Sequence, residues 1–314
     1  MENKRIKVTK TEYLTTGDQK IDQYLNGGLP TSSLIHLYGK RNLSSSGKTQ
    51  LGLQLSITAQ LKKELGGLEK GNYSQIILNF CSVYINKEKK FPTERLLQLS
   101  EKYDTQLTQK QILNNIHIIY SPTIDLLKEI IMNKLREYLI EKKKENQQVG
   151  VVIIDNIQFI LNNNNSSIDI VDYSDLYLIV QQLNILKEEF GLIVIMINNV
   201  NDVIDNNEKL NSSNLISLKY QINKINKLKI QPNFGLTFKN YISNQIILSR
   251  IKQNYKTREN NKQNKNENNE DNDSSIISNN SNLRILKTIG CRWCKDSELN
   301  YIITRDGLVY SESK

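Results

Sequence analysis

The sequence predicts an α/β protein with a doubly wound, mostly parallel sheet and late antiparallel strands at one edge. Apolar runs of strand length alternate with amphipathic stretches along most of the 314 residues, which is the order that βαβ units require. The run at 149–154 is continuously apolar, as is typical of a strand buried on both faces of a parallel sheet. Earlier in the chain, the run at 34–38 leads through small residues directly into a helical pattern.

The predicted strands are short apolar runs bounded by turn-forming or charged residues. They lie at 34–38, 76–85, 116–120, 149–154, 192–197, 245–251 and 283–289. The runs at 301–304 and 308–310 flank Arg305, Asp306 and Gly307, which indicates a closing hairpin.

The predicted helices carry apolar residues at helical spacing. They lie at 18–25, at 49–65, from Pro92 onward, at 123–146 and at 173–190. Gly27, Gly28 and Pro30 predict a turn after the first helix, and Gly66 and Gly67 end the second.

We divide the chain into four segments. Residues 1–15 form a basic lead-in, 16–253 the core, 254–282 an Asn/Lys-rich low-complexity insertion, and 283–314 the closing strands of the core. The insertion cannot bury enough apolar surface to order itself, because it is almost entirely polar. The stretch 199–232 is polar and without a clear period, which predicts a loop.

Composition limits the functional classes. Lys and Arg total 42 against 33 Asp and Glu, a net charge of +9 that suits a polyanionic partner. No apolar run approaches the roughly 18 residues of a membrane span, and the polar N-terminus does not resemble a secretory signal, so we expect no membrane partner. Three cysteines do not make a disulfide framework, which favours a reducing compartment, cytosol or nucleus.

The stretch LIHLYGKRNLSSSGKTQLGLQL at 34–55 has the strand–loop–helix order of a P-loop. In such loops, backbone N–H groups and the positive helix end hold a polyphosphate. Gly47 permits close approach, Lys48 places its charge on the β- and γ-phosphates, and the Thr49 hydroxyl is a Mg²⁺ ligand. We expect nucleotide contacts from Asn42, Leu43, Ser44, Ser45, Ser46, Gly47, Lys48, Thr49 and Gln50.

The loop departs from the usual pattern. Asn42 stands where the pattern has glycine, and the nearest upstream glycine is Gly39. Either Asn42 serves, because asparagine tolerates left-handed backbone, or the loop carries an insertion after Gly39. The alternative to a phosphate cradle is a Ser/Gly-rich turn that binds nothing, which the flanking strand and helix disfavour.

Two further positions fit nucleotide chemistry. Asp155 closes the apolar run at 149–154, where a Walker B carboxylate would hold the metal ion, although such an aspartate can also cap a turn. Glu88 follows the next strand after the P-loop and is a candidate base that activates water; its lysine neighbours would keep it ionised, and a surface ion-pair cluster is the alternative. Asn198 and Asn199, at the tip of the strand at 192–197, are candidate γ-phosphate sensors.

The CRWC motif gives little support for a metal site. Cys291 and Cys294 have metal-like spacing, but no second pair exists and both histidines fall within predicted strands, so we expect no zinc. Trp293 is a candidate for stacking on a base, with partial burial as the simpler interpretation.

With these residues in place, the chain from 14 to 310 resembles the RecA-like P-loop NTPase core of the eukaryotic strand-exchange recombinases and their paralogues. No single segment is decisive, but the ordered set is specific for this superfamily. The segments are TTGDQKIDQYLNGGLP, SSSGKTQLGLQL, GGLEKG with VYINKEKKFPTERL, VVIID, INNVN, PNFGLTFKNYISNQIILSR, and LRILKTIG with LNYIITRDGLVY.

The resemblance implies a function and a set of roles. Lys48 and Thr49 would bind ATP and Mg²⁺, Asp155 would be the Walker B residue, and Glu88 the catalytic base. The family acts on single-stranded or branched DNA beside a recombinase, often in a hetero-oligomer with a partner paralogue. The resemblance therefore implies a nuclear factor of homologous recombination.

The sequence also departs from the family pattern. Asn199 replaces the glutamine that couples the γ-phosphate to DNA, and no segment matches the family's small helical N-terminal domain or its linker aromatic. The first DNA loop, 162–175, carries Asp169, Asp172 and Asp175 without Lys or Arg, which disfavours tight DNA binding there.

Three hypotheses follow. The first is an ATP-dependent recombination factor with slow hydrolysis. The second is a nucleotide-stabilised scaffold for a partner paralogue with little or no turnover, which the acidic loop favours. A P-loop kinase for small molecules is disfavoured, because the sequence offers no substrate pocket or arginine-bearing lid.

Overall fold

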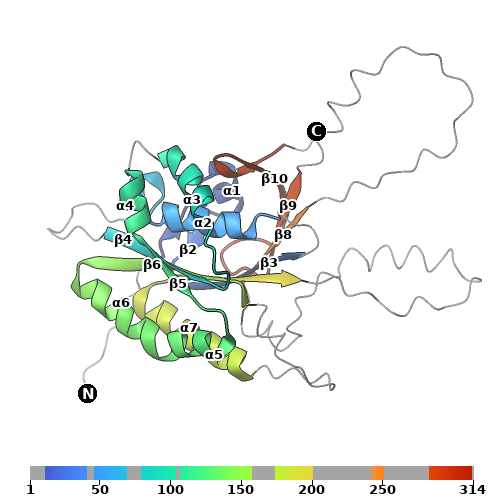
Figure 1. Cartoon of the computed structure of the whole chain (residues 1–314). Helices are drawn as coiled ribbons and strands as arrows, with labels where there is room; N and C mark the ends of the chain where they lie inside the picture. The colour runs from blue at the N-terminus through green and yellow to red at the C-terminus, as the bar shows by residue number, and fades with distance from the viewer. Residues whose placement is uncertain are drawn as a thin grey trace, which may run out of the picture.

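The computed structural model describes residues 11–40, 46–68, 79–103, 107–157, 174–200, 242, 244–250 and 283–312. Its central feature is a nine-stranded sheet in the order β11-β10-β9-β8-β3-β7-β6-β4-β5 (Figure 1). The strands are β3 (Ser33–Lys40), β4 (Asn79–Asn86), β5 (Ile116–Tyr120), β6 (Gln147–Asp155), β7 (Ile193–Val200), β8 (Asn244–Arg250), β9 (Arg284–Ile289), β10 (Glu298–Thr304) and β11 (Gly307–Tyr310).

The sheet has a parallel part and an antiparallel part. Strand β3 pairs in parallel with β7 and β8, and β6 pairs in parallel with β4 and β7. The late strands β9, β10 and β11 continue the sheet beyond β8 in antiparallel pairs. Both parts of the predicted fold class are thereby confirmed.

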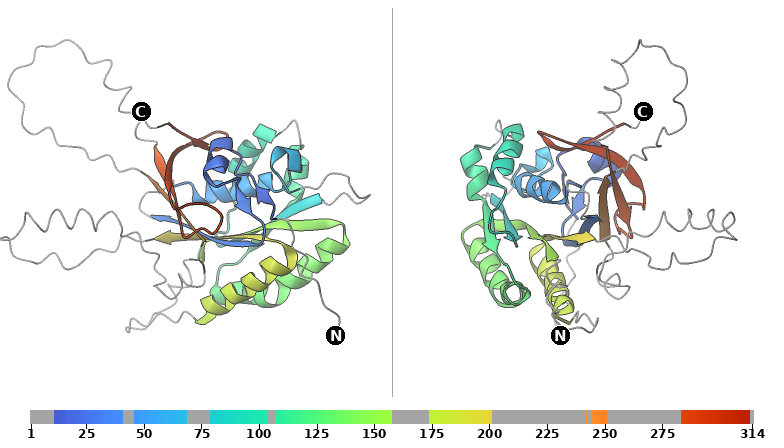
Figure 2. Two further views of the ribbon diagram at one scale, coloured as in Figure 1. Left: turned by 180° about the vertical axis from the view of Figure 1, so that it is seen from behind. Right: turned by 45° about the vertical axis from the view of Figure 1, so that its right-hand side comes forward.

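Helices cover both faces of the sheet, as Figures 1 and 2 show. One face carries α1 (Gln19–Tyr24), α2 (Lys48–Thr58), α3 (Thr93–Ser100) and α4 (Gln109–Asn114). The other carries α5 (Ile124–Glu129), α6 (Leu135–Lys144) and α7 (Ser174–Phe190). A π-helical turn at Ile130–Lys134 joins α5 to α6, so the single helix predicted at 123–146 is continuous but not regular.

The central strand β6 shows why the run at 149–154 is continuously apolar. Val151 and Ile153 pack into the cluster on the α2 face, whereas Val152 and Ile154 pack into the cluster on the α7 face. All four side chains are at most 1% exposed, so each face of β6 is buried as predicted.

The helix predicted at 49–65 is wrong in its length, because α2 ends at Thr58. The amides of Gln60 and Leu61 bond three residues back, to Ile57 and Thr58 at 3.1 Å each, which tightens the chain into a turn. A short 3₁₀ helix at Lys63–Leu65 follows.

Two features near the N-terminal side of the core were not predicted. A small separate sheet pairs β1 (Tyr13–Leu14) with β2 (Leu29–Pro30), so the last residues of the predicted lead-in are ordered and Leu14 is fully buried. Helix α4 also had no prediction. The division into four segments stays a prediction, because most of 1–15 and the insertion at 254–282 lie outside the described residues.

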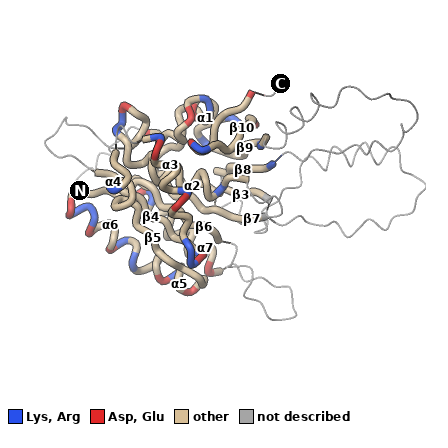
Figure 3. Tube along the Cα trace, turned by 45° about the horizontal axis from the view of Figure 1, so that its top comes forward, with Lys and Arg blue, Asp and Glu red and all other residues tan. Residues whose placement is uncertain are grey.

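Charge lies mainly on the helices of the outer layers. Figure 3 shows α6 with acidic and basic residues along its length. Among the helices in the described ranges, none has both the length and the apolar character that crossing a bilayer requires.

Candidate functional site

The junction between β3 and α2 carries the glycine, lysine and threonine of the predicted P-loop. Gly47 precedes α2 with a φ of 90°, a left-handed backbone that glycine adopts without strain. A Cβ at this position would come 2.9 Å from Cδ1 of Ile303, so a larger residue would require the end of that side chain to shift. Four predicted nucleotide-binding residues lie outside the described part: Asn42, Leu43, Ser44 and Ser45.

Lys48 is a buried cation at the first position of α2. Its ammonium donates to Ser46 Oγ at 2.8 Å and to the Gly39 carbonyl oxygen at 3.3 Å, both neutral acceptors. Burial lowers the pKa of this ammonium to about 8, and the nearby Asp155 carboxylate only partly opposes that shift. A charge held in this way gains most from a bound anion, because its neighbours do not neutralise it.

Thr49 and Asp155 come together although 106 residues separate them. The Thr49 hydroxyl donates to Asp155 Oδ2 at 2.8 Å, which joins the start of α2 to the end of β6. Tyr84, on β4, donates from its hydroxyl to the same carboxylate oxygen at 2.7 Å. The sequence predicted the roles of Thr49 and Asp155. It gave no sign of the role of Tyr84, because a tyrosine in a buried strand usually serves only to pack the core.

The electrostatics of Asp155 suit a metal ion. Burial raises the pKa of its carboxyl, and the proximity of Glu88 adds to that shift. The hydrogen bonds from Tyr84 and Thr49 act in the opposite direction. A hydroxyl and a carboxylate within bonding distance are oxygen ligands of the kind that Mg²⁺ prefers, so the residues present fit this ion. Within the described ranges, no group of three or more His, Cys, Asp or Glu side chains is placed to hold a metal ion.

Glu88 lies just beyond the end of β4, beside this carboxylate. The side chain of Asn86 fixes its backbone on both sides: Asn86 Nδ2 donates to the Glu88 carbonyl at 2.7 Å, and the Glu88 amide donates to Asn86 Oδ1 at 3.2 Å. The Lys87 amide donates to the Asp155 carbonyl at 3.0 Å, which ties this loop to β6. The Glu88 side chain itself is exposed and free to face a bound reactant.

The two asparagines at the end of β7 face opposite ways. Ile197 packs on the α2 side of the sheet. Its Cδ1 lies 3.3 Å from the position that a Cβ on Gly52 of α2 would take. Because strand side chains alternate, Asn199 shares that side and Asn198 faces the α7 side. Asn198 is fully buried, and its amide oxygen and nitrogen have no hydrogen-bond partner among the residues that the structure describes. The sensor role stays a prediction, and position favours Asn199 for it.

Gln50, the third residue of α2, already has a hydrogen-bond partner within the protein. Its side-chain oxygen accepts a hydrogen bond from Nε of Arg95 on α3. Arg95 also donates to the Thr304 carbonyl at 2.7 Å, so this arginine links the P-loop helix to the β10–β11 hairpin. Nothing in the sequence marked Arg95, since an arginine in an amphipathic helix usually lies on a solvated face.

The structure also describes four other residues that the sequence analysis singled out. Cys291 and Cys294 lie after β9 as free thiols, and Trp293 packs against the core with its indole N–H buried. Asp175, predicted to be in an acidic loop, lies in the first turn of α7 and pairs with Lys128. The rest of that loop, 162–173, lies outside the described residues.

Comparisons with known proteins identify a family and several relatives. A family model described as Rad51 matches residues 6–216. A DNA repair protein XRCC3 homolog of Arabidopsis thaliana is 24% identical over 314 residues, covering 94% of this chain and 92% of that protein. DNA repair protein rhp57 of Schizosaccharomyces pombe is 33% identical over 48% of this chain and 40% of its own length. DNA repair protein XRCC3 of Mus musculus is 34% identical over 39% of this chain and 34% of its own length.

Proposed function

This chain belongs to the Rad51 family, whose model matches residues 6–216, and from this premise we propose that it is an ATP-binding factor of homologous recombination. It acts on single-stranded or branched DNA at double-strand breaks, in the nucleus, beside a strand-exchange recombinase and a partner paralogue. The observation that carries the proposal is the 2.8 Å contact between the Thr49 hydroxyl and Asp155 Oδ2. This contact supports the proposal because it joins the threonine of the predicted P-loop to the predicted Walker B carboxylate.

Each predicted site residue has its own role in nucleotide binding and hydrolysis. The amides before α2 and the Lys48 ammonium bind the phosphates, which lie where the helix dipole is positive. Thr49 and Asp155 would hold Mg²⁺, which would neutralise negative charge on the bound phosphates. Glu88 orients and deprotonates the attacking water, and Asn199 reports the γ-phosphate to the chain beyond β7.

The proposal is tested by nucleotide binding and DNA-dependent turnover. The full chain, purified with a companion paralogue, should bind a fluorescent ATP analogue with Mg²⁺ and release phosphate faster when single-stranded DNA is added. A complex with no affinity for adenine nucleotides would contradict the proposal. Salt titration of DNA binding separates phosphate contacts from other contributions, because each phosphate contact steepens the salt dependence.

A second candidate is a scaffold subunit that binds nucleotide without useful turnover. Two observations favour it: Asp169 and Asp172 put negative charge in the predicted DNA loop, and the exposed Glu88 carboxylate has lysines on both sides. In this case ATP stabilises one arrangement of a subunit interface, and hydrolysis is not required for the function.

Glu88→Gln separates the two candidates. If Glu88 is the base, the substitution should lower the rate of phosphate release at least about 100-fold while leaving ATP affinity within about twofold, because only proton transfer is lost. The measurement is single-turnover hydrolysis by the complex, together with survival of damaged cells that carry only the variant. Glu94→Gln, which neutralises an exposed carboxylate on α3, is the matched control. If cells that carry Glu88→Gln survive fully although the complex no longer hydrolyses ATP, the scaffold candidate is the correct one.

Nucleotide binding should depend on pH through Lys48. Its pKa of about 8 in the free protein means that the ammonium loses its proton as the pH rises through 8, and bound phosphate restores it. Affinity for nucleotide should therefore fall above pH 8, approaching about tenfold per pH unit. The number of protons taken up per nucleotide bound should rise from about 0.1 at pH 7 to about 0.9 at pH 9. Calorimetry in two buffers of different ionisation enthalpy measures that uptake. If proton uptake does not change between pH 7 and pH 9, Lys48 is not the group that links protonation to nucleotide binding.

A further inference from the structure

The β10–β11 hairpin reaches the P-loop from the far end of the sequence. Tyr301 on β10 is fully buried, and its hydroxyl donates a hydrogen bond to the Ser46 carbonyl oxygen, 255 residues away. Ile303, two residues further along β10, lies against Gly47. Ser46 is thus held from two sides, because its hydroxyl also accepts the bond from Lys48.

The Tyr301 hydrogen bond fixes the orientation of one peptide unit in the cradle. A trans peptide is planar, and its C=O and N–H point in opposite directions. Since the Ser46 carbonyl points to Tyr301, the N–H of Gly47 points away from it. Without this bond, the peptide next to a glycine in left-handed backbone has little to resist rotation.

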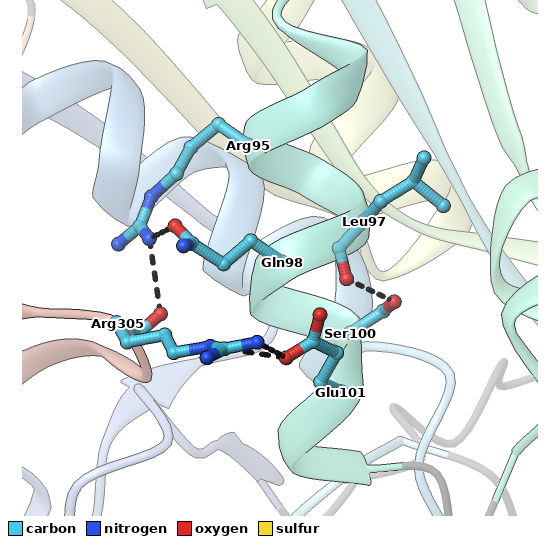
Figure 4. Close-up of polar contacts among 6 residues, drawn as sticks. All are labelled: Arg95, Leu97, Gln98, Ser100, Glu101 and Arg305. Atoms are coloured by element: carbon cyan, nitrogen blue, oxygen red, sulfur yellow. Dashed lines mark hydrogen bonds and ion pairs between the residues drawn. The ribbon is translucent and has the colours of Figure 1, made fainter.

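The hairpin does not depend on that hydroxyl for its own position. Gln54 of α2 accepts a bond from the Leu308 amide at 2.9 Å and donates to the Thr16 carbonyl, which fixes β11. At the hairpin turn, Arg95 donates to the Arg305 carbonyl at 3.0 Å, and the Arg305 guanidinium pairs with Glu101, as Figure 4 shows. Removing the Tyr301 hydroxyl should therefore leave the ring and the hairpin in place.

We propose that Tyr301 is a positioning residue for the phosphate-binding loop: its hydroxyl holds the 46–47 peptide so that the Gly47 N–H is directed at bound phosphate. The inference rests on the proposed function, because it assigns a ligand to this amide. Burial raises the pKa of the Tyr301 phenol, so the hydroxyl remains a donor throughout the physiological range.

The test is Tyr301→Phe in the full chain with its companion subunit. This variant should bind Mg²⁺–ADP and inorganic triphosphate about five- to tenfold more weakly than the parent, since one oriented donor is lost. Displacement of fluorescent ADP measures both, and the melting temperature without nucleotide should stay within about 2 °C of the parent. Tyr310→Phe on β11, whose hydroxyl has no bond to the described P-loop residues 46–49, is the control and should bind as the parent does.

The outcomes separate the inference from the function. If the parent binds no nucleotide, the proposed function and this inference fail together. If the parent binds and Tyr301→Phe binds equally well, only the inference fails. A weaker affinity accompanied by a large drop in melting temperature would make Tyr301 a packing residue and also overturn the inference.

Discussion

Replacing Lys48 with alanine is expected to abolish measurable nucleotide binding without unfolding the protein. Lys48 is 8% exposed, and within the described residues its ammonium bonds to the neutral oxygens of Gly39 and Ser46, so a bound polyphosphate would be the main partner of its charge. Loss of a buried charge-assisted contact costs about 2–5 kcal/mol of binding free energy, so affinity should fall at least about 30-fold. Titration with a fluorescent ATP analogue in the presence of Mg²⁺ measures it.

The same variant should be as stable as the parent when no nucleotide is present. Burial that lowers the pKa of Lys48 to about 8 also disfavours its charged form in the folded protein, so this group does not favour folding at neutral pH. Melting curves with and without Mg²⁺–ATP check this: the parent should gain stability from nucleotide and Lys48→Ala should not. Lys110→Ala, which removes an exposed lysine from α4, controls for net charge. Parent-like affinity in Lys48→Ala would contradict the site.

The sequence predicted those parts of the site whose chemistry allows few alternatives. A Gly-Lys-Thr after a strand and an aspartate closing a continuously apolar run have few other uses together, and Thr49 and Asp155 do meet. The run at 149–154 also indicated burial on both faces, because only a covered parallel strand needs apolar residues at every position. Predictions of this kind depend on local pattern alone.

The parts that were missed depend on contacts between distant segments. Tyr84, Arg95 and Tyr301 have ordinary residue types at ordinary positions, and each acquires a role only when the fold brings it against Asp155, Gln50 or Ser46. No spacing rule connects residues that lie 45 to 255 positions apart. The end of α2 was missed for a similar reason: the bond of Thr58 Oγ1 to the Thr15 carbonyl at 2.9 Å is a tertiary contact.

Gly39 shows how such contacts constrain a residue that the sequence left ambiguous. It was a candidate for the first glycine of the loop, but it lies within β3, opposite Asn199 of β7 in the sheet register. On its other side is β8, and a Cβ on Gly39 would lie 2.0 Å from the Leu248 carbonyl oxygen and 3.1 Å from its carbon. Both atoms belong to the backbone, so no side chain can rotate to make room.

Gly39→Ala is therefore expected to destabilise the protein strongly. Strand β8 would have to move away from β3, although it is also paired with β9, and such a shift disrupts close-packed core on both faces. We expect a loss of about 3 kcal/mol or more in the free energy of unfolding, measured by urea denaturation. Gly191→Ala is the control that separates the effect of a steric clash from that of backbone conformation. The φ of Gly191 is 71°, but an added Cβ there meets nothing within 4 Å, so this substitution should cost only about 1 kcal/mol of the free energy of unfolding. Equal losses in the two variants would mean that β3 and β8 are not held at this distance.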